Sequence, residues 1–417
     1  MIFFIYQFLL SIILFFSPLI IIIRIFKNKE DKLRFKEKFC FISKKRGNGK
    51  LIWFHGSSVG EILSVIPIIK KYDNDKSISK ILITSSTLSS SKILEKMKFK
   101  KTIHQFYPID HILFSKKFLD HWRPDLAIFL ESEIWPSMFK SIKNKNIRLI
   151  LLNARITRKS FNRWSYILKF SHSIFKLVDL AYSQNSETNY FLKKLNVKNI
   201  KSIGNLKFIE YDSFKTNRSD KKLFSQFKKY RTFVAASTHG TEEIFAAKTH
   251  ILLKKKARNT ITIIIPRHID RVEEIISQIK GLGLNVISRD SNKKNLNDID
   301  IYIVNTFGES KKFYKFATTV FLGGSIINRG GQNPLEPARF GAKILHGPNT
   351  DNFKDVYKLL KVFKISKRVN SFKQLASSIV FKKNKNDGVK IKNIGEKILK
   401  KTIKELDYFI NNEFKKT

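Results

Sequence analysis

The chain has 417 residues, more than one hydrophobic core usually spans, and its single cysteine, Cys40, excludes an internal disulfide framework and fits a reducing compartment. It carries 80 Lys and Arg against 34 Asp and Glu residues, a formal charge of +46, which indicates an anionic partner, either a membrane surface or nucleic acid. The excess is spread along the whole chain and no clustered arginine tract or nucleic-acid motif stands out, so we expect no nucleic-acid partner.

The first residues predict a membrane anchor. Residues 2–23 contain no charged side chain and are rich in Phe, Leu and Ile, and a bilayer core needs ~20 such residues. The segment lacks the basic start and small-residue cleavage site of a secretory signal. Basic residues follow it, at Arg24, Lys27, Lys29, Lys32 and Arg34. By the positive-inside rule we expect residues 1–26 to form an uncleaved single-pass anchor with the body in the cytoplasm, although Pro18 also suits a helix that enters the membrane without crossing it.

The N-terminal half predicts βα units on a parallel sheet. A first strand at 51–55 breaks at a Gly-containing turn, and a helix begins at Glu61. Further strand-like apolar runs are separated by helical stretches, at 80–84, 103–106, 125–130, 147–152 and 178–182. This alternation is typical of an α/β domain, which we place at residues 27–210.

The same rhythm restarts after a polar, lysine-rich passage at 211–231, which we interpret as the interdomain linker. The second set of strand-like runs lies at 232–236, 261–265, 284–287, 301–304, 319–322 and 343–346. We place the second domain at residues 211–390, followed by a basic helix at 391–417. The predicted fold class is therefore α/β, with two Rossmann-like domains facing across a cleft and an N-terminal anchor helix.

A glycine-rich stretch at 323–353 predicts a nucleotide site. The strand 319–322 stops at one glycine pair, Gly323-Gly324, and a second pair, Gly330-Gly331, precedes a helix start at Asn333. Glycine lets a backbone approach a ligand closely, and a helix N-terminus favours phosphate. A plain helix cap is the alternative. An Asn cap followed by Pro and by Glu three residues later forms a capping box, but a cap does not explain the glycine pairs.

Eight short motifs occur in one order along the chain. They are HGSSVGE (55–61), ESEIWP (131–136), NARIT (153–157), GNLKF (204–208), AASTHGTEE (235–243), PRH (266–268), FGE (307–309) and GGQNPLEPA (330–338). In these motifs the chain resembles the 3-deoxy-D-manno-octulosonic acid (Kdo) transferases of lipopolysaccharide biosynthesis. It departs from the family pattern at Arg329 and Gln332, where His is usual, and at Leu88-Ser89, where Pro-Thr is usual.

The resemblance implies a GT-B glycosyltransferase at the inner membrane. Such an enzyme moves Kdo from CMP-Kdo to lipid IVA, a lipid A precursor, and releases CMP, with the acceptor bound by the N-terminal domain and the donor by the C-terminal domain. It implies work at an anionic membrane surface and no cofactor. No metal is expected, since the chain has no Asp-x-Asp before a polar turn and no His/Cys cluster.

The resemblance also implies roles for three residues of the N-terminal half. Glu61 is the general base, Glu131 stabilises the transition state and Lys207 neutralises negative charge as CMP leaves. At a helix start, Glu61 is expected to stay ionised. Strand alternation predicts that Glu131 and Glu133 point to opposite faces, so Glu133 is expected to cap a helix.

The residues implied for CMP-Kdo binding all follow predicted strands of the second half. They are Pro266, Arg267, Phe307, Gly308, Glu309, Asn333, Pro334, Leu335 and Glu336. Two other readings stay open: another envelope GT-B enzyme with a UDP-sugar donor, and a non-enzymatic basic membrane protein. A Ser-His-acid hydrolase is disfavoured, because no Gly-x-Ser-x-Gly turn occurs. Basic and aromatic residues between Arg155 and Tyr166 suggest a second membrane contact.

Overall fold

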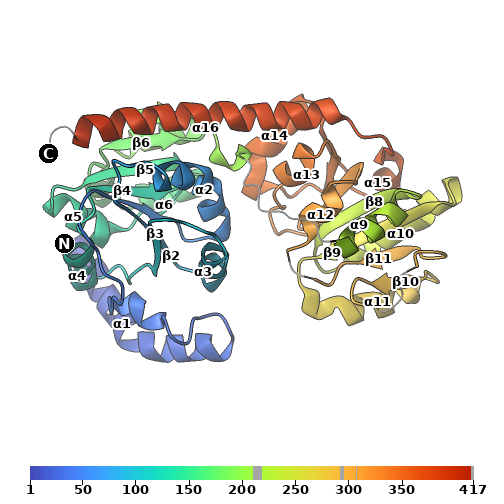
Figure 1. Ribbon diagram of the computed structural model, residues 1–417, viewed down its shortest axis with the longest axis horizontal. Helices are drawn as coiled ribbons and strands as arrows, with labels where there is room; N and C mark the ends of the chain where they lie inside the picture. Colours follow the sequence, from blue (N-terminus) through green and yellow to red (C-terminus); the bar gives the residue numbers. More distant parts are fainter. Residues whose placement is uncertain (210–217, 292–294, 307, 415–417) are drawn as a thin grey trace. The chain divides into compact units, whose positions relative to one another are not determined.

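The computed structural model describes residues 1–209, 218–291, 295–306 and 308–414. The chain forms two compact units, Met1–Tyr211 with Gly395–Thr417, and Asp212–Ile394. Each unit contains one seven-stranded sheet, and every strand pairing in both sheets is parallel (Figure 1). The predicted class of two Rossmann-like α/β domains is thus confirmed.

The N-terminal sheet has the strand order β3-β2-β1-β4-β5-β6-β7. Its strands are β1 (Leu51–His55), β2 (Lys80–Ser85), β3 (Thr102–Phe106), β4 (Leu126–Leu130), β5 (Arg148–Ala154), β6 (Leu180–Ser183) and β7 (Ile200–Ser202). Successive residues of β1 enter different cores, with Trp53 in one and Phe54 in the other, because side chains alternate between the faces of a strand. A continuous apolar run therefore marks a strand that is covered on both sides.

The helices of this unit follow the strands in sequence. They are α2 (Val59–Asp73), α3 (Leu88–Glu95), α4 (Ile112–Trp122), α5 (Pro136–Asn144), α6 (Arg158–Ser165), α7 (Leu168–Phe175) and α8 (Ser186–Lys194), with the 3₁₀ helices η1 (Phe35–Phe39) and η2 (Leu206–Phe208). The order reverses between β1 and β4, which neighbour each other although β2 and β3 lie between them in the chain. Ligands of doubly wound sheets bind at the carboxyl ends of the strands beside such a reversal.

The C-terminal sheet has the order β10-β11-β9-β8-β12-β13-β14. Its strands are β8 (Arg231–Thr238), β9 (Thr260–Pro266), β10 (Val286–Ser288), β11 (Ile301–Ile303), β12 (Thr319–Leu322), β13 (Lys343–His346) and β14 (Ser366–Arg368). Its helices are α10 (Glu242–Lys256), α11 (Val272–Lys280), α12 (Ser310–Tyr314), α13 (Leu335–Arg339), α14 (Lys354–Val362) and α15 (Phe372–Ser378), with the 3₁₀ helices η3 (Ile269–Arg271) and η4 (Asp351–Phe353).

The polar passage that the sequence suggested as a linker is only partly one. It contains the helix α9 (Arg218–Phe227), and the ring of Phe227 is buried. Phe227 stacks on Phe316 at 5.3 Å between ring centroids and meets Tyr302 edge-on at 5.1 Å. The second half of the passage therefore belongs to the core of the C-terminal unit.

The last helix, α16 (Lys385–Phe414), contributes residues to both units. From Gly395 onward it packs on the N-terminal unit, where Leu406 and Ile410 join the core. Asp407 accepts hydrogen bonds from Lys71 and from the Tyr72 hydroxyl. The N-terminal unit is therefore completed by a segment about two hundred residues away in the chain.

The first helix, α1 (Ile2–Phe26), has 25 residues and a mean hydropathy of 2.6. Among the described residues it is the one helix long and apolar enough to cross a membrane. It is consistent with the predicted membrane anchor.

Candidate active site

Four polar side chains of the N-terminal unit gather at the carboxyl ends of β1 and β4. They are Glu61, Glu131, Glu133 and Lys207. Glu61 lies in the first turn of α2, which follows β1, and the next two follow β4. Lys207 lies in η2 and reaches the group through an ion pair with Glu131.

Glu61 is held by the turn between β1 and α2. Ser58 caps the helix, accepting from the Glu61 N–H at 3.3 Å, and its hydroxyl donates to Glu61 Oε1 at 2.8 Å. The Ser57 N–H donates to Oε2 at 2.8 Å. Gly56 makes room for this carboxylate, because a Cβ there would lie 2.8 Å from Leu130 Cδ1 and 3.2 Å from Glu61 Cβ. The orientation of Glu61 is thus fixed by its own motif.

The environment of Glu61 corrects the expectation that a helix start keeps it ionised. Burial, followed by the negative charges of Glu133 and Glu131, raises the pKa of Glu61 to about 7, and the two hydrogen bonds from the turn only partly oppose this. Loss of water and two neighbouring carboxylates outweigh the helix dipole. A carboxyl with this pKa can accept a proton at neutral pH, where an ordinary glutamate is a weak base.

Glu131 ends β4 and pairs with Lys207. Its φ of +49° is left-handed, so the chain leaves the strand direction directly after Leu130. Glu131 Oε1 lies 2.7 Å from Lys207 Nζ. Asn153, also left-handed at φ +55°, donates from Nδ2 to Glu131 Oε1 at 3.4 Å and accepts the Leu206 N–H at 3.0 Å. Asn153 thereby fixes η2 and its lysine beside Glu131, and the strained backbone is typical of a functional site.

Glu133 is not the helix cap that strand alternation predicted. The prediction was wrong because the left-handed turn at Glu131 breaks the alternation, and α5 has no side-chain cap. Three donors converge instead on Glu133 Oε2: the Ser57 hydroxyl at 2.5 Å, Trp135 Nε1 at 2.9 Å and His55 Nε2 at 3.2 Å. Burial alone would raise the pKa of Glu133, but these donors hold it below its ordinary value.

His55, read from the sequence as a lone residue at a strand end, belongs to this network. Its ring is fully buried and stacks on Tyr107 at 3.8 Å between centroids. Its Nδ1 lies 2.9 Å from the Thr84 hydroxyl, which already accepts from Trp53 Nε1 at 2.8 Å. The hydroxyl proton can then go to Nδ1, which leaves the proton on Nε2 for Glu133. His55 therefore donates to Glu133 and keeps this carboxylate in place.

In the C-terminal unit, close packing explains why glycine stands at position 323, in the first glycine pair. A Cβ on Gly323 would lie 2.4 Å from the Ser237 carbonyl oxygen. The buried carboxylate of Glu242 accepts from the N–H groups of Gly324 at 2.6 Å, Ser325 at 3.0 Å and Ile326 at 2.9 Å. These amides, beside the glycine pair that the sequence suggested for close approach to a ligand, are thus satisfied from within the protein.

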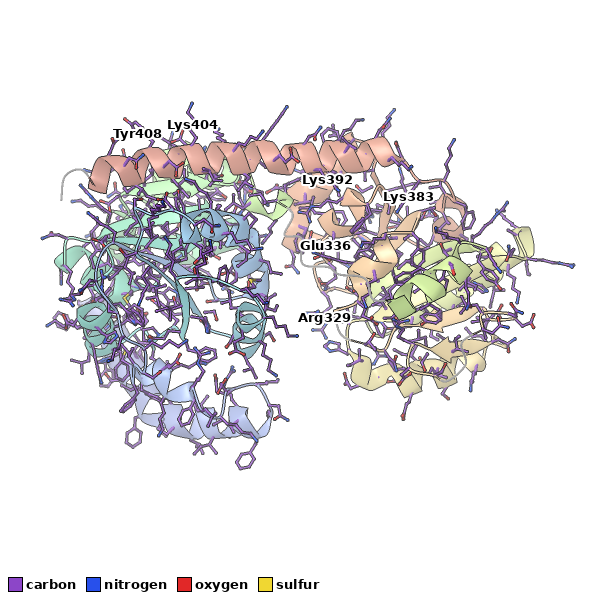
Figure 2. The ribbon with its side chains drawn as sticks, in the orientation of Figure 1. Arg329, Glu336, Lys383, Lys392, Lys404 and Tyr408 are labelled. Atoms are coloured by element: carbon purple, nitrogen blue, oxygen red, sulfur yellow. The ribbon has the colours of Figure 1, made fainter. Side chains whose placement is uncertain are left out.

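The second glycine pair packs on the loop that ends in η4. Gly330 and Gly331 have φ of +77° and +70°, and a Cβ on Gly330 would lie 2.7 Å from Asn352. The capping box was the alternative interpretation of this stretch. Asn333 Oδ1 accepts from the Leu335 N–H at 3.0 Å, but the cap residue of α13 is Pro334, which makes no side-chain cap bond. Glu336, on the short helix α13, is half-buried, and no partner of its carboxylate is found in the described part of the chain (Figure 2).

The other predicted donor residues follow β9 and β11. Pro266 is the buried last residue of β9, and Arg267 beside it is exposed. Gly308 has φ of +82°, and Phe307 lies outside the described residues. Glu309 accepts from Arg289 Nε at 3.2 Å and Lys312 Nζ at 2.6 Å. The carboxylate of Glu309 is therefore neutralised within the protein.

Positive charge gathers at the carboxyl ends of β8 and β9. Burial, followed by the charges of His268, Arg267, Arg329 and Arg271, lowers the pKa of His239 to about 4. The imidazole of His239 is therefore neutral at pH 7, and its buried Nε2 has no partner in the described residues. This edge of the sheet suits an anionic group such as a phosphate.

The described residues contain no group of three or more His, Cys, Asp and Glu side chains that could hold a metal ion. Two doubly wound parallel α/β units, with a carboxylate–lysine site in one and a basic strand edge in the other, define the GT-B fold class. A solved neighbour shares the fold: UDP-GlcNAc 2-epimerase from Neisseria meningitidis bound to UDP-GlcNAc. It has a TM-score of 0.55 and 12% sequence identity, over 85% of this chain and 100% of that one.

Sequence comparison identifies the family. Residues 33–210 match the family model described as 3-deoxy-D-manno-octulosonic-acid transferase (kdotransferase). The chain is 33% identical over 396 residues to the 3-deoxy-D-manno-octulosonic acid transferase of Rickettsia bellii, covering 95% of this chain and 94% of the relative. The enzyme of the same name from Rickettsia prowazekii is 33% identical over 366 residues, covering 88% and 77%. The chain therefore belongs to the Kdo transferase family and is a glycosyltransferase.

Proposed function

We propose that this enzyme transfers Kdo from CMP-Kdo to a hydroxyl of lipid IVA and releases CMP. The observation that carries the proposal is Glu61, a desolvated carboxylate with a pKa of about 7 at the carboxyl end of β1. Membership of the family supports Kdo as the sugar that is transferred. The site of the N-terminal unit supports removal of a proton from the acceptor hydroxyl by a carboxylate.

In this proposal Glu61 accepts the proton of the acceptor hydroxyl. The acceptor oxygen forms a bond to the anomeric carbon of Kdo as the bond from that carbon to the CMP phosphate oxygen breaks. The electron pair of the broken bond leaves with CMP. Hydrogen bonds from Ser57 and Ser58 hold both oxygens of Glu61, so the base needs no reorientation before it acts.

Glu131 and Lys207 act as a pair on the charge that develops. As the bond to CMP weakens, positive charge accumulates on the sugar ring and negative charge on the leaving phosphate. The carboxylate of Glu131 stabilises the first and the ammonium group of Lys207 the second. Their 2.7 Å contact and the bonds of Asn153 pre-organise both groups.

The donor is proposed to bind the C-terminal unit. Arg267 is exposed beside a neutral His239 and can donate to phosphate or cytosine, while Glu336 can accept from ribose hydroxyls. Pro266, Gly308, Asn333, Pro334 and Leu335 shape the backbone around them. Glu309, together with Phe307, is proposed to hold the cytosine. Because Glu309 forms ion pairs with Arg289 and Lys312, we propose that it holds the loop around the cytosine more than it contacts the cytosine itself.

The membrane-bound acceptor places the enzyme at the cytoplasmic face of the inner membrane in this proposal. The apolar helix α1 and the positive charge of the chain both favour that surface.

Nucleotide release tests the proposal. Purified enzyme in detergent is incubated with lipid IVA and either CMP-Kdo or UDP-sugars, and the nucleotides formed are separated by chromatography. Release of CMP that depends on lipid IVA is expected. Release of UDP with no CMP would instead assign the chain to another envelope glycosyltransferase.

A further inference from the structure

The helix α1 has one face that is less exposed than the other from its first turn to its last. Side chains at helical spacing on this face are half-buried or buried, from Phe3 through Tyr6, Leu10 and Leu14 to Ser17 and Ile21. Those on the other face are exposed, among them Phe4 at 77%, Phe15 at 79% and Phe26 at 83%. A helix that left the protein to cross a bilayer would be covered only near its last turn.

The beginning of α1 is fixed by polar contacts. The Tyr6 hydroxyl donates to Asp110 Oδ2 at 2.6 Å, and this buried carboxylate also accepts the N–H groups of Ser137 at 3.0 Å and Met138 at 2.9 Å, in the first turn of α5. Gln7 donates from Nε2 to Ser137 Oγ at 2.6 Å and accepts the Ile112 N–H at 3.1 Å. The first two turns of α1 are therefore attached to α4 and α5.

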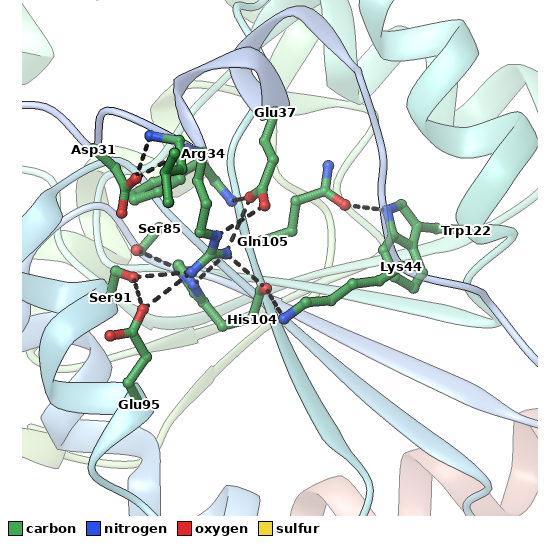
Figure 3. A network of polar contacts seen from close by, with 12 residues as sticks. Asp31, Arg34, Glu37, Lys44, Ser85, Ser91, Glu95, His104, Gln105 and Trp122 are labelled. Carbon is green, nitrogen blue, oxygen red and sulfur yellow. Dashed lines mark hydrogen bonds and ion pairs between the residues drawn. The ribbon is translucent and has the colours of Figure 1, made fainter.

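The end of α1 is attached to the same unit. Arg24 Nε lies 3.0 Å from Glu30 Oε2, a buried carboxylate that also binds Lys38 Nζ at 2.7 Å. Figure 3 shows the network that follows. Arg34 binds Glu37 at 2.9 Å and the carbonyl oxygen of His104, in β3, at 3.0 Å. The chain is thus clamped to the edge of the N-terminal sheet within ten residues of the end of α1.

We infer that α1 lies in the plane of the membrane surface, with its covered face on the N-terminal unit and its exposed face in the acyl region of the cytoplasmic leaflet. A helix of 25 residues is ~37 Å long, and the hydrocarbon core is ~30 Å thick, so a crossing would put its ends on opposite sides. Both ends bind one globular unit, so a crossing would break the contacts at one of them. The sequence predicted a single crossing, and the contacts of Tyr6 and Gln7 are the reason to replace it.

Exposed side chains beside α1 continue this surface. Leu113 is 64% exposed and follows Ile112, whose N–H bonds Gln7. Tyr166 is 88% exposed and lies four residues before Phe170, whose ring packs near Tyr6. Basic residues that follow α1 are exposed as well, at Lys27, Lys29 and Lys32. An apolar face with a basic rim is typical of a helix that lies in an anionic lipid interface. The inference rests on the proposed membrane location of the enzyme.

The topology of the N-terminus tests the inference. A Gly-Ser-Cys extension is placed before Met1 in a Cys40→Ser background, since Cys40 is buried, and labelled with a membrane-impermeant maleimide. An in-plane helix predicts labelling in inverted inner-membrane vesicles and none in right-side-out spheroplasts. Labelling from the spheroplast side alone would overturn the inference. Either result leaves CMP release unaffected, so the test does not depend on the proposed function.

Cross-linking in native membranes tests the docked face directly. Gln7→Cys with Ser137→Cys is expected to be joined by a short bifunctional thiol cross-linker, because the side chains of Gln7 and Ser137 are in contact. The matched control pairs Phe8→Cys with Ser137→Cys. Phe8 is 66% exposed, and the control is expected to give at least tenfold less product. Equal yields in both pairs would show that α1 is not docked through this face.

Discussion

The raised pKa of Glu61 predicts that Glu61→Gln gains stability while it loses activity. The pKa is about 7 in the folded protein against an ordinary value of 4.5. One pH unit corresponds to about 1.36 kcal/mol, so ionising Glu61 costs the folded state up to about 3 kcal/mol relative to the unfolded chain. Glutamine has nearly the same shape without the charge, and it avoids this cost.

The upward direction of the pKa shift decides the pH range in which the two proteins differ in stability. Because the folded-state pKa is above the unfolded value, the folded state holds the proton more tightly between pH 4.5 and about 7. The free energy of unfolding of the wild type therefore falls as the pH rises through that window. Glu61→Gln should be more stable than the wild type by up to about 3 kcal/mol at pH 8, and the difference should vanish near pH 4.5.

Urea unfolding followed by tryptophan fluorescence measures this effect. All four tryptophans lie in the N-terminal unit, at Trp53, Trp122, Trp135 and Trp164, so the signal reports on the unit that contains Glu61. The rate of Kdo transfer by Glu61→Gln is expected to fall by about 10²–10⁴. A variant that is inactive but no more stable than the wild type at pH 8 would refute the account of Glu61 as a desolvated base.

Asp73→Asn is the matched control, because the pKa of Asp73 is lowered where that of Glu61 is raised. Burial alone would raise the pKa of Asp73, but hydrogen bonds from the Lys100 and Lys101 N–H groups and the Thr102 hydroxyl lower it. The contribution of Asp73 to stability is present above its unfolded-state pKa and is lost as the pH falls through the folded value. Asp73→Asn should therefore destabilise the N-terminal unit most at pH 8 and least in acid.

Three further predictions concern other parts of the chain. Glu133→Gln should lower the pH at which kcat/KM is half-maximal below 7, because it removes the charge that most raises the pKa of Glu61, and an unchanged pH profile would contradict this coupling. Gly323→Ala should destabilise the C-terminal unit by about 1–3 kcal/mol in hydrogen-exchange measurements, because its Cβ would meet the Ser237 carbonyl oxygen, while Gly60→Ala, with open space around it, should be neutral or stabilising. In protein that lacks residues 1–26, charge reversal at Arg158, Lys159 and Arg163 should weaken binding to anionic liposomes with no change in CMP-Kdo affinity, and binding that survives would show that this helix faces water.

The structure qualifies the second membrane contact that the sequence suggested near α6. Phe161 stacks on Phe191 at 4.6 Å between centroids, and Trp164 meets Phe175 edge-on at 5.3 Å. Both rings therefore pack against the core of the N-terminal unit. Of the three aromatic residues in that stretch only Tyr166 is left for a lipid surface.

The fold was predictable because buried strands of a doubly wound sheet are continuous apolar runs. All twelve predicted strands occur, with ends that differ by up to two residues. The two missed strands, β7 (Ile200–Ser202) and β14 (Ser366–Arg368), each have three residues, lie at a sheet edge and are mostly exposed. A short polar edge strand has no periodic signal, and only its neighbour in the sheet defines it.

Motifs mark Glu61, Glu131 and Lys207 as candidates, and the structure brings these three side chains together. The side chains around them were less predictable. The position of Glu133 depends on one left-handed residue after β4, and a non-glycine residue gives no sequence sign of that conformation. The glycine pairs were interpreted as room for a ligand, yet the buried carboxylate of Glu242, 82 residues before Gly324, accepts hydrogen bonds from the amides after Gly323. Local backbone conformation decides the first case, and a contact between distant segments decides the second.

The central claim is that this enzyme adds Kdo to a lipid acceptor with Glu61 as the base. Mass spectrometry of lipid IVA after incubation with CMP-Kdo and the full-length enzyme tests it most directly. The account predicts that the wild type increases the acceptor mass by one or more Kdo residues, and that Glu61→Gln, folded by its tryptophan fluorescence, gives about 10²–10⁴ times less product in the same time. An unmodified acceptor with active-site residues intact, or equal product from Glu61→Gln, would contradict it.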